Sequence, residues 1–210
     1  ALIRDGIVLA DETNKAMQAA FATNSDWLIY IQGDEVLHED GFPAIIQAME
    51  KYKDDKRVDG LLFKYLHFYG SYDYVATSSH WYKNEIRIIK NNTSIYSYKD
   101  AQGFRKGNDE KLHVKSVDAF MHHYGWVKEP TIMMDKLFNA GTIWQGSDVV
   151  KERKKHNHLI SFDYSQIDIL EKFAAKHPKT INNRIQSKNW NFEYDLSNKK
   201  VSVKEKIKNF

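Results

Sequence analysis

The sequence predicts an α/β protein with a mixed sheet flanked by helices. Three observations lead to this expectation. Helix-like and strand-like segments alternate at the start of the chain, short strand patterns fill the middle, and helical patterns dominate the last third. Short links between the first four elements favour parallel pairing of the two early strands. We therefore expect a core over residues 1–128 and a helical C-terminal extension, residues 129–210, packed on it.

The first helix and the first strand set up the most informative part of the chain. A helix is expected over residues 10–22, where apolar side chains recur at helical spacing. A polar Asn-Ser-Asp stretch ends it. The apolar run Trp27–Gln32 that follows is rich in β-forming residues, as is typical of a buried strand. Two carboxylates, Asp34 and Glu35, come directly after this strand.

A second helix and a second strand repeat the alternation. Asp40 can cap the helix and Pro43 lies in its first turn, so the helix is expected to run from residue 40 to residue 52. The charged segment 53–57 ends it, and residues 58–68 form the second strand. This order predicts an α/β sheet.

The middle of the chain predicts short strands joined by turns. Alternating apolar and polar residues indicate strands at 85–89, 94–98 and 112–117, and residues 106–109 form a hairpin tip. A further apolar run, 119–124, ends this β region. We expect a mixed or antiparallel addition to the first sheet.

The last third of the chain reads as helical. Helices are expected over residues 131–139, 148–156 and 165–175, the last stopping near Pro178. The lysine-rich segment 199–208 is expected to be a solvated tail, with a peripheral contact to an acidic membrane surface as the alternative.

The composition narrows the function classes. Of the 210 residues, 28% are charged, and no apolar run approaches the ~20 residues of a membrane span. The absence of cysteine excludes disulfides, thiolate metal sites and cysteine nucleophiles. We expect a cytoplasmic protein, with the inner face of the membrane as the alternative location. The net charge of +3 comes from scattered Lys and Arg residues, so nucleic acid is not an expected partner.

Asp34 and Glu35 are the first candidate site. Neighbouring strand residues point to opposite faces, so both acids can hold one ion only from a loop beyond the strand. Gly33 permits such a bend. Carboxylate oxygens suit Mg²⁺ or Mn²⁺, with phosphate oxygens and water as the other ligands. The alternative is a capped, solvated turn.

A pair of histidines is the second candidate. His122 and His123 end an apolar run, and on a strand only one of them can point into a given pocket. We favour His123, which precedes Tyr124-Gly125, as a third metal ligand or a phosphate contact. The alternative is a histidine hydrogen-bonded within the core.

Several polar side chains between these motifs are further candidates. Glu85 and Arg87 share one strand face, and either they pair with each other or Arg87 contacts an anionic ligand. The loop that carries Asp100 and Gln102 supplies a carboxylate and an amide, and Asp100 is the candidate general base. Asp118 is the second candidate catalytic carboxylate.

Five short motifs resemble those of the family 2 glycosyltransferases, in particular a group of bacterial glycosyltransferase-like proteins. They are Gln-x-Asp-Glu (32–35), His-Phe-Tyr-Gly (67–70), Glu-Ile-Arg-Ile-Ile (85–89), Asp-Ala-Gln-Gly-Phe-Arg (100–105) and His-Tyr-Gly-Trp-Val (123–127). The likeness runs from about Leu2 to Val127 and implies the GT-A fold, a Rossmann-like mixed sheet. It also implies a nucleotide-diphospho-sugar donor and a hydroxyl acceptor on a glycan, lipid or polysaccharide.

The resemblance assigns roles to individual residues. Asp34 is the counterpart of the metal-binding acid, Asn14 lies near the nucleotide, and His123 lies near the metal. With Arg87 and Gln102, Asn14 and Asp34 form the expected donor-binding set. Two features depart from the family: the acidic motif has no acid at Gln32, and no opening strand–helix unit precedes Leu2, so the fold is expected to lack that unit.

Two other functions remain open. The first is a catalytically silent domain of the same fold that binds a nucleotide or sugar, because fold and activity are separable. The second is a hydrolase that uses Asp34 with Asp100 or Asp118 as paired carboxylates, which would have to lie about 5–10 Å apart across a cleft.

Overall fold

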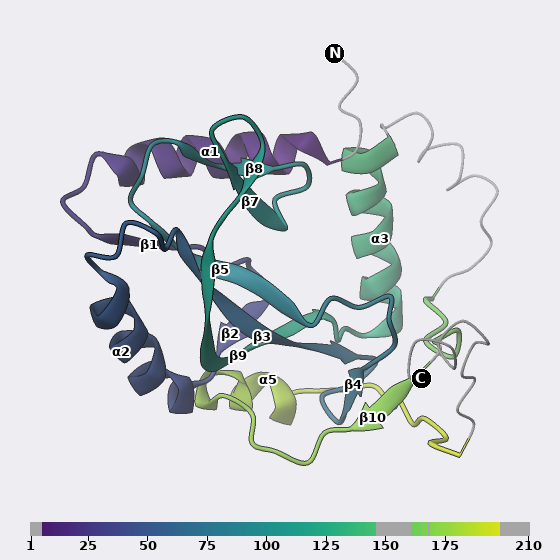
Figure 1. Cartoon of the computed structure of the whole chain (residues 1–210). Helices are drawn as coiled ribbons and strands as arrows, with labels where there is room; N and C mark the ends of the chain where they lie inside the picture. The colour runs from purple at the N-terminus through teal and green to yellow at the C-terminus, as the bar shows by residue number, and fades with distance from the viewer. Residues whose placement is uncertain (1–5, 146–160, 168, 198–210) are drawn as a thin grey trace.

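The computed structural model describes residues 6–145, 161–167 and 169–197. Its centre is a seven-stranded mixed sheet, with helices at its sides and a small three-stranded sheet beside it (Figure 1). The strands of the large sheet are β1 (Trp27–Ile29), β2 (Glu35–Leu37), β3 (Gly60–Tyr69), β4 (Tyr74–Ala76), β5 (Asn84–Lys90), β9 (Val114–Trp126) and β10 (Leu170–Lys172). The α/β class expected from the sequence is confirmed.

The long strand β3 organises the large sheet. It pairs antiparallel with β5 through residues 60–64 and with β4 through His67 and Phe68. Along its other edge it pairs in parallel with β9. The short strand β2 in turn pairs antiparallel with β9. The sheet is therefore mixed, as expected.

The predicted parallel pairing of the two early strands is wrong. β1 and β3 do not hydrogen-bond to each other, because β5 lies between them and is antiparallel to both. Residues 87–89 of β5 are fully buried, so this strand belongs in the centre of a sheet rather than at its margin. The strand expected over Trp27–Gln32 is shorter, ending at Ile29.

The first two helices match their predicted ranges closely. α1 (Ile7–Phe21) lies across the top of Figure 1, and α2 (Phe42–Tyr52) lies at its left, preceded by the short 3₁₀ turn η1 (Glu39–Gly41). α2 packs on β9, and its approach depends on Gly41, since a Cβ there would lie 2.8 Å from the Ala119 Cβ. Glycine is required by this close contact.

The small sheet confirms the predicted hairpin. It consists of β6 (Ile95–Tyr98), β7 (Gly103–Lys106) and β8 (Glu110–Lys111), and the β7–β8 turn covers residues 107–109. The loop before β7 contains Lys99 and Ala101 with φ of 54° and 61°, although neither is glycine. Such left-handed residues are unfavourable unless their surroundings hold them.

The C-terminal region is less helical than expected. α3 (Pro130–Gln145) contains the predicted helix 131–139, whereas the helix predicted at 148–156 and the lysine-rich segment 199–208 lie outside the described residues. The helix predicted at 165–175 is wrong, because this segment contains β10, paired with β4. The helical region ends with the 3₁₀ turn η2 (Lys179–Ile181) and α5 (Asn182–Gln186).

The error at β10 has a clear physical reason. Leu170 and Phe173 are three residues apart, a spacing that suits one face of a helix. In an extended chain the same spacing sends them to opposite faces. Leu170 is buried against Tyr69, and Phe173 packs against Phe68 in another cluster. The segment forms a strand because only an extended chain places Leu170 and Phe173 in these two clusters on opposite faces of the sheet.

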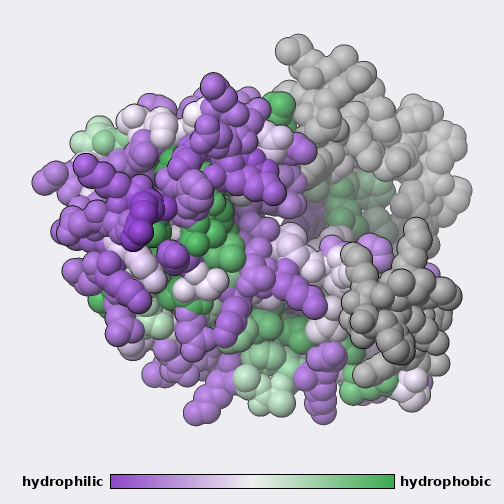
Figure 2. All heavy atoms as spheres, in the orientation of Figure 1, coloured by the Kyte–Doolittle hydropathy of each residue, from purple (hydrophilic) through white to green (hydrophobic). Residues whose placement is uncertain are grey.

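No described helix is both long and apolar enough to cross a lipid bilayer. Hydrophilic residues cover most of the face shown in Figure 2. The buried apolar side chains form four clusters, and their removal from water is the main apolar contribution to the stability of the fold.

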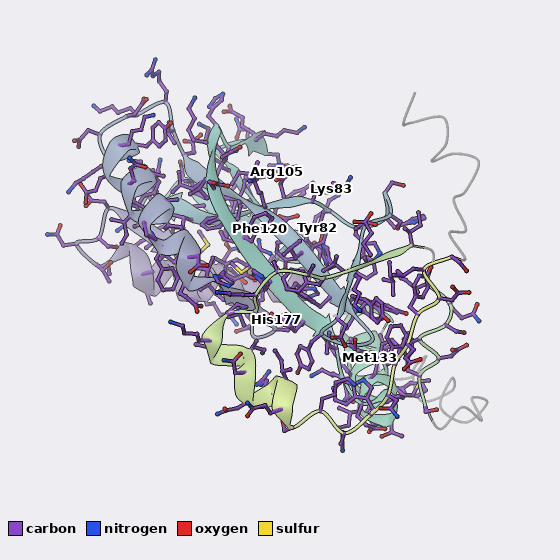
Figure 3. The ribbon with its side chains drawn as sticks, turned by 90° about the horizontal axis from the view of Figure 1, so that it is seen from below. Tyr82, Lys83, Arg105, Phe120, Met133 and His177 are labelled. Carbon is purple, nitrogen blue, oxygen red and sulfur yellow. The ribbon has the colours of Figure 1, made fainter. Side chains whose placement is uncertain are left out.

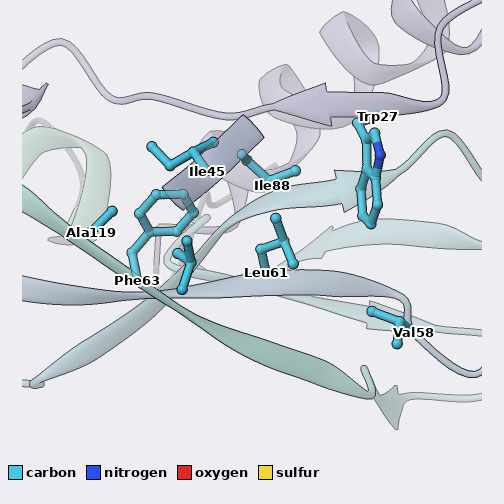
Figure 4. Close-up of a cluster of buried hydrophobic side chains, with 8 residues drawn as sticks. Trp27, Ile45, Val58, Leu61, Phe63, Ile88 and Ala119 are labelled. Atoms are coloured by element: carbon cyan, nitrogen blue, oxygen red, sulfur yellow. The ribbon is translucent and has the colours of Figure 1, made fainter. Parts of the chain in front are cut away.

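One cluster joins α2 to the sheet. The side chains gather in one group in Figure 4, where Ile45 of α2 faces strand residues from β3 and β5. Leu61, Phe63 and Ile88 have no exposed surface at all. Its buried members are Trp27, Ile45, Val58, Leu61, Phe63, Ile88, Val117 and Ala119.

We predict that Phe63→Ala lowers the free energy of unfolding by about 3–5 kcal/mol, because it removes a fully buried ring and leaves a cavity. Urea denaturation measures the change. Phe42→Ala is the matched control, since Phe42 is 48% exposed, and surface changes usually stay within about 0.5 kcal/mol. Equal losses in the two variants would contradict the position of this core.

Candidate functional site

A buried ion pair between Glu35 and Arg87 lies next to the candidate site. Glu35 at the beginning of β2 and Arg87 in β5 both have side chains with 0% exposure. The Arg87 Nε donates to Glu35 Oε2 at 2.9 Å and its Nη2 donates to Oε1 at 2.6 Å. This two-point geometry is the strongest form of a carboxylate–guanidinium contact. It ties the loop after β1 to the middle of the sheet.

Further hydrogen bonds hold the Glu35 carboxylate and the Arg87 guanidinium in place. Glu35 also accepts hydrogen bonds from the Tyr65 hydroxyl and the Gln32 main-chain N–H. The remaining guanidinium nitrogen of Arg87 donates to the carbonyls of Ile86 and Gln102. Burial alone would lower the pKa of Arg87, but its bonds to the Glu35 carboxylate keep that pKa above the usual range.

These contacts correct two assignments. Each carboxylate oxygen of Glu35 already accepts two hydrogen bonds within the protein, and Arg87, whose side chain has 0% exposure, uses four of its five N–H donors there. The alternative considered for Arg87, a pair with Glu85, is the weaker contact at 3.7 Å. The partner is the acid 52 positions earlier, which no local pattern indicates.

Asp34 lies on the other side of this loop and does meet polar groups from distant elements. Its Oδ2 is 3.6 Å from Nε2 of His123 in β9 and 3.0 Å from Nζ of Lys136 in α3. The Asp34 side chain is 32% exposed. The structure thus brings together two of the three residues that the sequence analysis assigned to a metal, Asp34 and His123, and adds a lysine.

The hydrogen bonds around His123 fix its tautomer. His67 Nε2 lies 3.0 Å from the Tyr82 carbonyl oxygen, which can only accept, so His67 Nε2 carries a proton. Burial lowers the pKa of His67 to about 3, which keeps it neutral. Its Nδ1 is therefore an acceptor. Since His123 Nδ1 lies 3.2 Å from that atom, it must be the donor.

This chain of hydrogen bonds leaves a lone pair on His123 Nε2 whenever His123 is neutral, and that nitrogen lies 3.6 Å from Asp34 Oδ2. Two acceptors that face each other require a positive charge between or beside them. A proton on Nε2, the Lys136 ammonium or a divalent cation meets this need. An imidazole whose other N–H is held by a second residue is also the usual arrangement for a metal ligand.

Gly125 makes the close approach of these groups possible. A Cβ at this position would lie 2.5 Å from His123 Nε2 and 2.7 Å from Asp34 Oδ2. The Gly125 carbonyl also accepts a hydrogen bond from Lys136 at 2.7 Å. The glycine in the His-Tyr-Gly-Trp-Val motif therefore keeps open the space between the carboxylate and the imidazole.

The electrostatic surroundings keep Asp34 ionised. Burial by itself would raise the pKa of this carboxyl, but hydrogen bonds and positive charge from His123 and Lys136 outweigh burial, and the pKa lies below its usual range. Asp34 and His123 together provide two protein ligands for a single cation. Among the described residues no group of three or more His, Cys, Asp or Glu forms a metal cluster, so phosphate or water would have to complete the coordination.

The other sequence candidates lie elsewhere. Asn14 hydrogen-bonds the main chain of Ser97 through both side-chain atoms and so fastens α1 to β6, which gives it a structural role rather than a nucleotide contact. Asp118 forms a surface ion pair with Lys64 and its side chain is 82% exposed. The structure therefore does not bring Asp118 together with the network of Glu35 and His123, and its assignment as a catalytic carboxylate stays a prediction.

The loop before β7 remains next to the buried ion pair. Gln102 is exposed and contributes its carbonyl to Arg87, so the expected donor contact through its amide side chain gains no support. Asp100 is half-buried, and its charge helps to raise the pKa of Glu85. That pKa reaches about 7, chiefly through burial, with further contributions from Glu35 and Asp100.

Several residues of this network had no signal in the sequence. Lys136 is 102 positions from Asp34, in a helix without a motif. Tyr65 and Tyr82 lie against His67, and Tyr82 is labelled in Figure 3 beside Lys83 on the loop before β5. His67 alone had a possible signal, since it opens the His-Phe-Tyr-Gly motif.

His122 faces the opposite side of the sheet, as strand alternation requires, but it is buried rather than solvent-facing. It stacks on Phe68 and lies 5.4 Å from the His38 ring. Its Nδ1 has no hydrogen-bond partner among the described residues. Burial lowers the pKa of His122 to about 4.

Comparison with known proteins does not assign a family. No protein-family model matches the chain, and no curated protein matches it.

We predict that Glu35→Gln lowers the free energy of unfolding by about 3–5 kcal/mol, because Arg87 stays buried without its counter-ion. Urea denaturation at pH 7 measures the loss. Asp118→Asn is the matched control, since it removes an exposed carboxylate from a surface pair and should leave stability nearly unchanged. A Glu35→Gln protein as stable as this control would contradict the central role of the buried pair.

We predict that stability falls as the pH drops from about 6.5 to about 4.5. In the unfolded chain a histidine has a pKa near 6.5, whereas His67 and His122 stay neutral in the fold, with pKa values of about 3 and about 4. The unfolded state therefore binds more protons in this window, and acid favours it.

Replacing His122 by phenylalanine should reduce the slope of stability against pH by up to about 1.4 kcal/mol per pH unit. Urea denaturation between pH 4.5 and 7.5 measures this slope. His113→Phe is the control, because His113 has a side chain that is 76% exposed. An unchanged slope in His122→Phe would show that this imidazole titrates normally in the fold.

Proposed function

We propose that this protein is a glycosyltransferase that moves a sugar from a nucleotide-diphospho-sugar donor to a hydroxyl acceptor on a glycan, lipid or polysaccharide. The observation that carries the proposal is the close approach of Asp34 Oδ2 and His123 Nε2 beside Lys136. This pair needs a positive charge, which a bound divalent cation can supply in place of a proton on His123, and it lies within two of the five motifs that resemble family 2 glycosyltransferases. Mg²⁺ or Mn²⁺ is the proposed cofactor.

Asp34 and His123 would hold the cation, which when bound supplies positive charge to the diphosphate leaving group. The chain's own residues perform the other tasks. His67 keeps the His123 Nε2 lone pair directed at the site through its Nδ1 contact. Lys136 donates hydrogen bonds to Asp34 and to the Gly125 carbonyl. In the proposed mechanism its ammonium moves from Asp34 to a phosphate oxygen and keeps its bond to Gly125.

The proposed transfer forms one bond and breaks another. The acceptor hydroxyl oxygen attacks the anomeric carbon, the bond from that carbon to the diphosphate oxygen breaks, and the hydroxyl proton passes to a carboxylate. Asp100 remains the candidate base. Glu85 is the second candidate, since a carboxyl with a pKa of about 7 can accept a proton at neutral pH.

A catalytically silent domain that binds a nucleotide sugar is the second candidate function. It is favoured by the saturated contacts of Glu35 and Arg87, which leave Asp34 as the one acid of the motif able to meet a ligand. The hydrolase alternative, with Asp34 and either Asp100 or Asp118 as its carboxylates, gains no support from Asp118, which pairs with Lys64 on the surface.

We predict that Asp34→Asn lowers the Mn²⁺-dependent affinity for uridine or guanosine diphosphate by at least about tenfold, because the neutral amide is a weaker ligand for a hard cation. Isothermal titration with each nucleotide, with and without Mn²⁺, measures the effect. Asp118→Asn is the control of equal chemistry at an exposed position.

His123→Ala should weaken binding in the same way, whereas His122→Ala should not, because only His123 faces Asp34. Unchanged Mn²⁺-dependent affinity in both Asp34→Asn and His123→Ala would remove the cation site. Binding of the nucleotide sugar without any sugar transfer would instead identify the silent domain.

A further inference from the structure

The outer edge of β1 carries main-chain groups with no strand beside them. β1 lies at the left margin of the large sheet in Figure 1, below α1, and β5 is its one strand neighbour in the described part of the chain. The Tyr30 N–H donates to the Arg87 carbonyl at 2.9 Å, so residues 28 and 30 turn their main-chain groups toward β5. The outward N–H and C=O groups are therefore those of Trp27, Ile29 and Ile31.

Other sheet edges of this molecule are protected by charge or by a covering side chain. β10, at the opposite end of the strand order, exposes Glu171 and Lys172, and in β8 both residues are exposed and charged. The edge of β6 is covered by α1, since the Asn14 amide bonds both main-chain groups of Ser97. Charges and covering elements are the usual protection against the addition of a strand. Residues 27–31 contain neither a charge nor a proline.

Apolar side chains are exposed along the same edge. Ile29 and Ile31 are 53% and 47% exposed. A hollow of about 460 Å³ lies beside them, between α1 and β1, and Leu28, Tyr30 and Ala16 are among its lining residues. Exposed apolar surface that gathers at one place marks an interaction site. The edge therefore offers both hydrogen-bonding groups and apolar surface to an added strand.

The edge is complementary to a second copy of itself. If two β1 edges run antiparallel about a two-fold axis at Ile29, each Ile29 exchanges both main-chain hydrogen bonds with Ile29 of the second copy. Trp27 does the same with Ile31 of the second copy, so every outward group gains a partner. The exposed isoleucines of the two copies also come together, and such cross-strand apolar pairs are favourable.

The charges near this edge do not oppose the pairing. Asp26, directly before the strand, pairs with Lys53 of the same chain at 3.0 Å. Glu12, which lines the hollow, pairs with Lys15 at 2.6 Å. Two copies would therefore join uncharged strands whose acidic neighbours already have counter-ions, and no like charges meet across residues 27–31.

We propose that β1 pairs antiparallel with β1 of a second copy of this chain, which joins the two large sheets into one continuous sheet across a two-fold axis. The inference goes beyond the proposed function and uses none of the residues assigned to the cation. Pairing over residues 27–31 is a small contact beside the ~1,200–2,000 Å² buried in stable complexes. We therefore expect a reversible dimer whose fraction rises with concentration.

The test measures the mass of the full chain by sedimentation velocity between about 1 μM and about 500 μM. We expect a monomer at the lowest concentration and a dimer at the highest. Ile29→Lys should weaken the association at least about tenfold, because it places two like charges opposite each other at the two-fold axis. Ile132→Lys is the matched control, since Ile132 is 56% exposed in α3, which lies at the right of Figure 1, away from β1.

Hydrogen exchange followed by NMR locates the contact. The Tyr30 amide is bonded to Arg87 in a single chain, whereas the Ile29 amide gains a partner only in the dimer. We expect exchange at Ile29 to slow as the concentration rises, and exchange at Tyr30 to change much less. Ile29→Lys should remove this concentration dependence at the Ile31 amide.

The inference is overturned if the chain stays monomeric over the whole range, or if Ile29→Lys and Ile132→Lys dimerise equally well. Protection of the Ile29 amide in a monomeric chain would also overturn it, by showing that another segment of the same chain covers the edge. Growth beyond a dimer would exclude the two-fold pairing, because that pairing uses the β1 edge of both copies. Both altered side chains are exposed, so both variants are expected to fold, which circular dichroism verifies.

Discussion

The contact between Glu35 and Arg87 holds the centre of this molecule in place. A charged pair with no exposed surface is costly to desolvate, and it is stable here because the carboxylate and the guanidinium also bond to Tyr65, Gln32 and two carbonyls. The pair joins the first loop to the middle strand. Asp34, the residue before Glu35, contacts His123 of β9 and Lys136 of α3.

The same pair divides two neighbouring acids between two tasks. The side chain of Glu35 is wholly buried against Arg87, whereas the side chain of Asp34 is 32% exposed. Adjacent carboxylates in a motif are commonly read as two ligands for one ion, but Glu35 opens β2 and bonds to Arg87, while Asp34 lies in the turn before that strand and meets His123 and Lys136. Strand alternation does divide the histidines, since His123 meets Asp34 while His122 stacks on Phe68 on the other face.

Much of the fold could be predicted because it depends on local patterns. α1, α2, the β7–β8 hairpin and the start of α3 follow from spacing, capping residues and turn residues. The order of the strands in the sheet depends instead on contacts between residues far apart in the sequence. β5 separates β1 from β3, and β10 occupies an edge where helical spacing suggested a helix, because side chains there enter clusters on opposite faces. Tertiary contacts decided both cases.

The candidate site shows the same limit. Asp34 and His123 could be chosen from motif position, since each ends an apolar run. Lys136 and the bond of Arg87 to Glu35 could not, because each partner comes from a distant helix or strand with no pattern of its own. Asn14 and Asp118 have suitable chemistry but lie in a helix–strand fastening and in a surface pair.

The parallel pairing of β3 with β9 has a consequence for the stage of folding at which the candidate site forms. Asp34, His67 and His123 come from three segments, and the two histidines meet only when β9 docks beside β3, 56 positions along the chain. Long-range pairing of this kind forms late, since the loop must close first. Partly folded chains would then carry no assembled site, and a ligand that needs all three residues would bind and protect only the finished molecule.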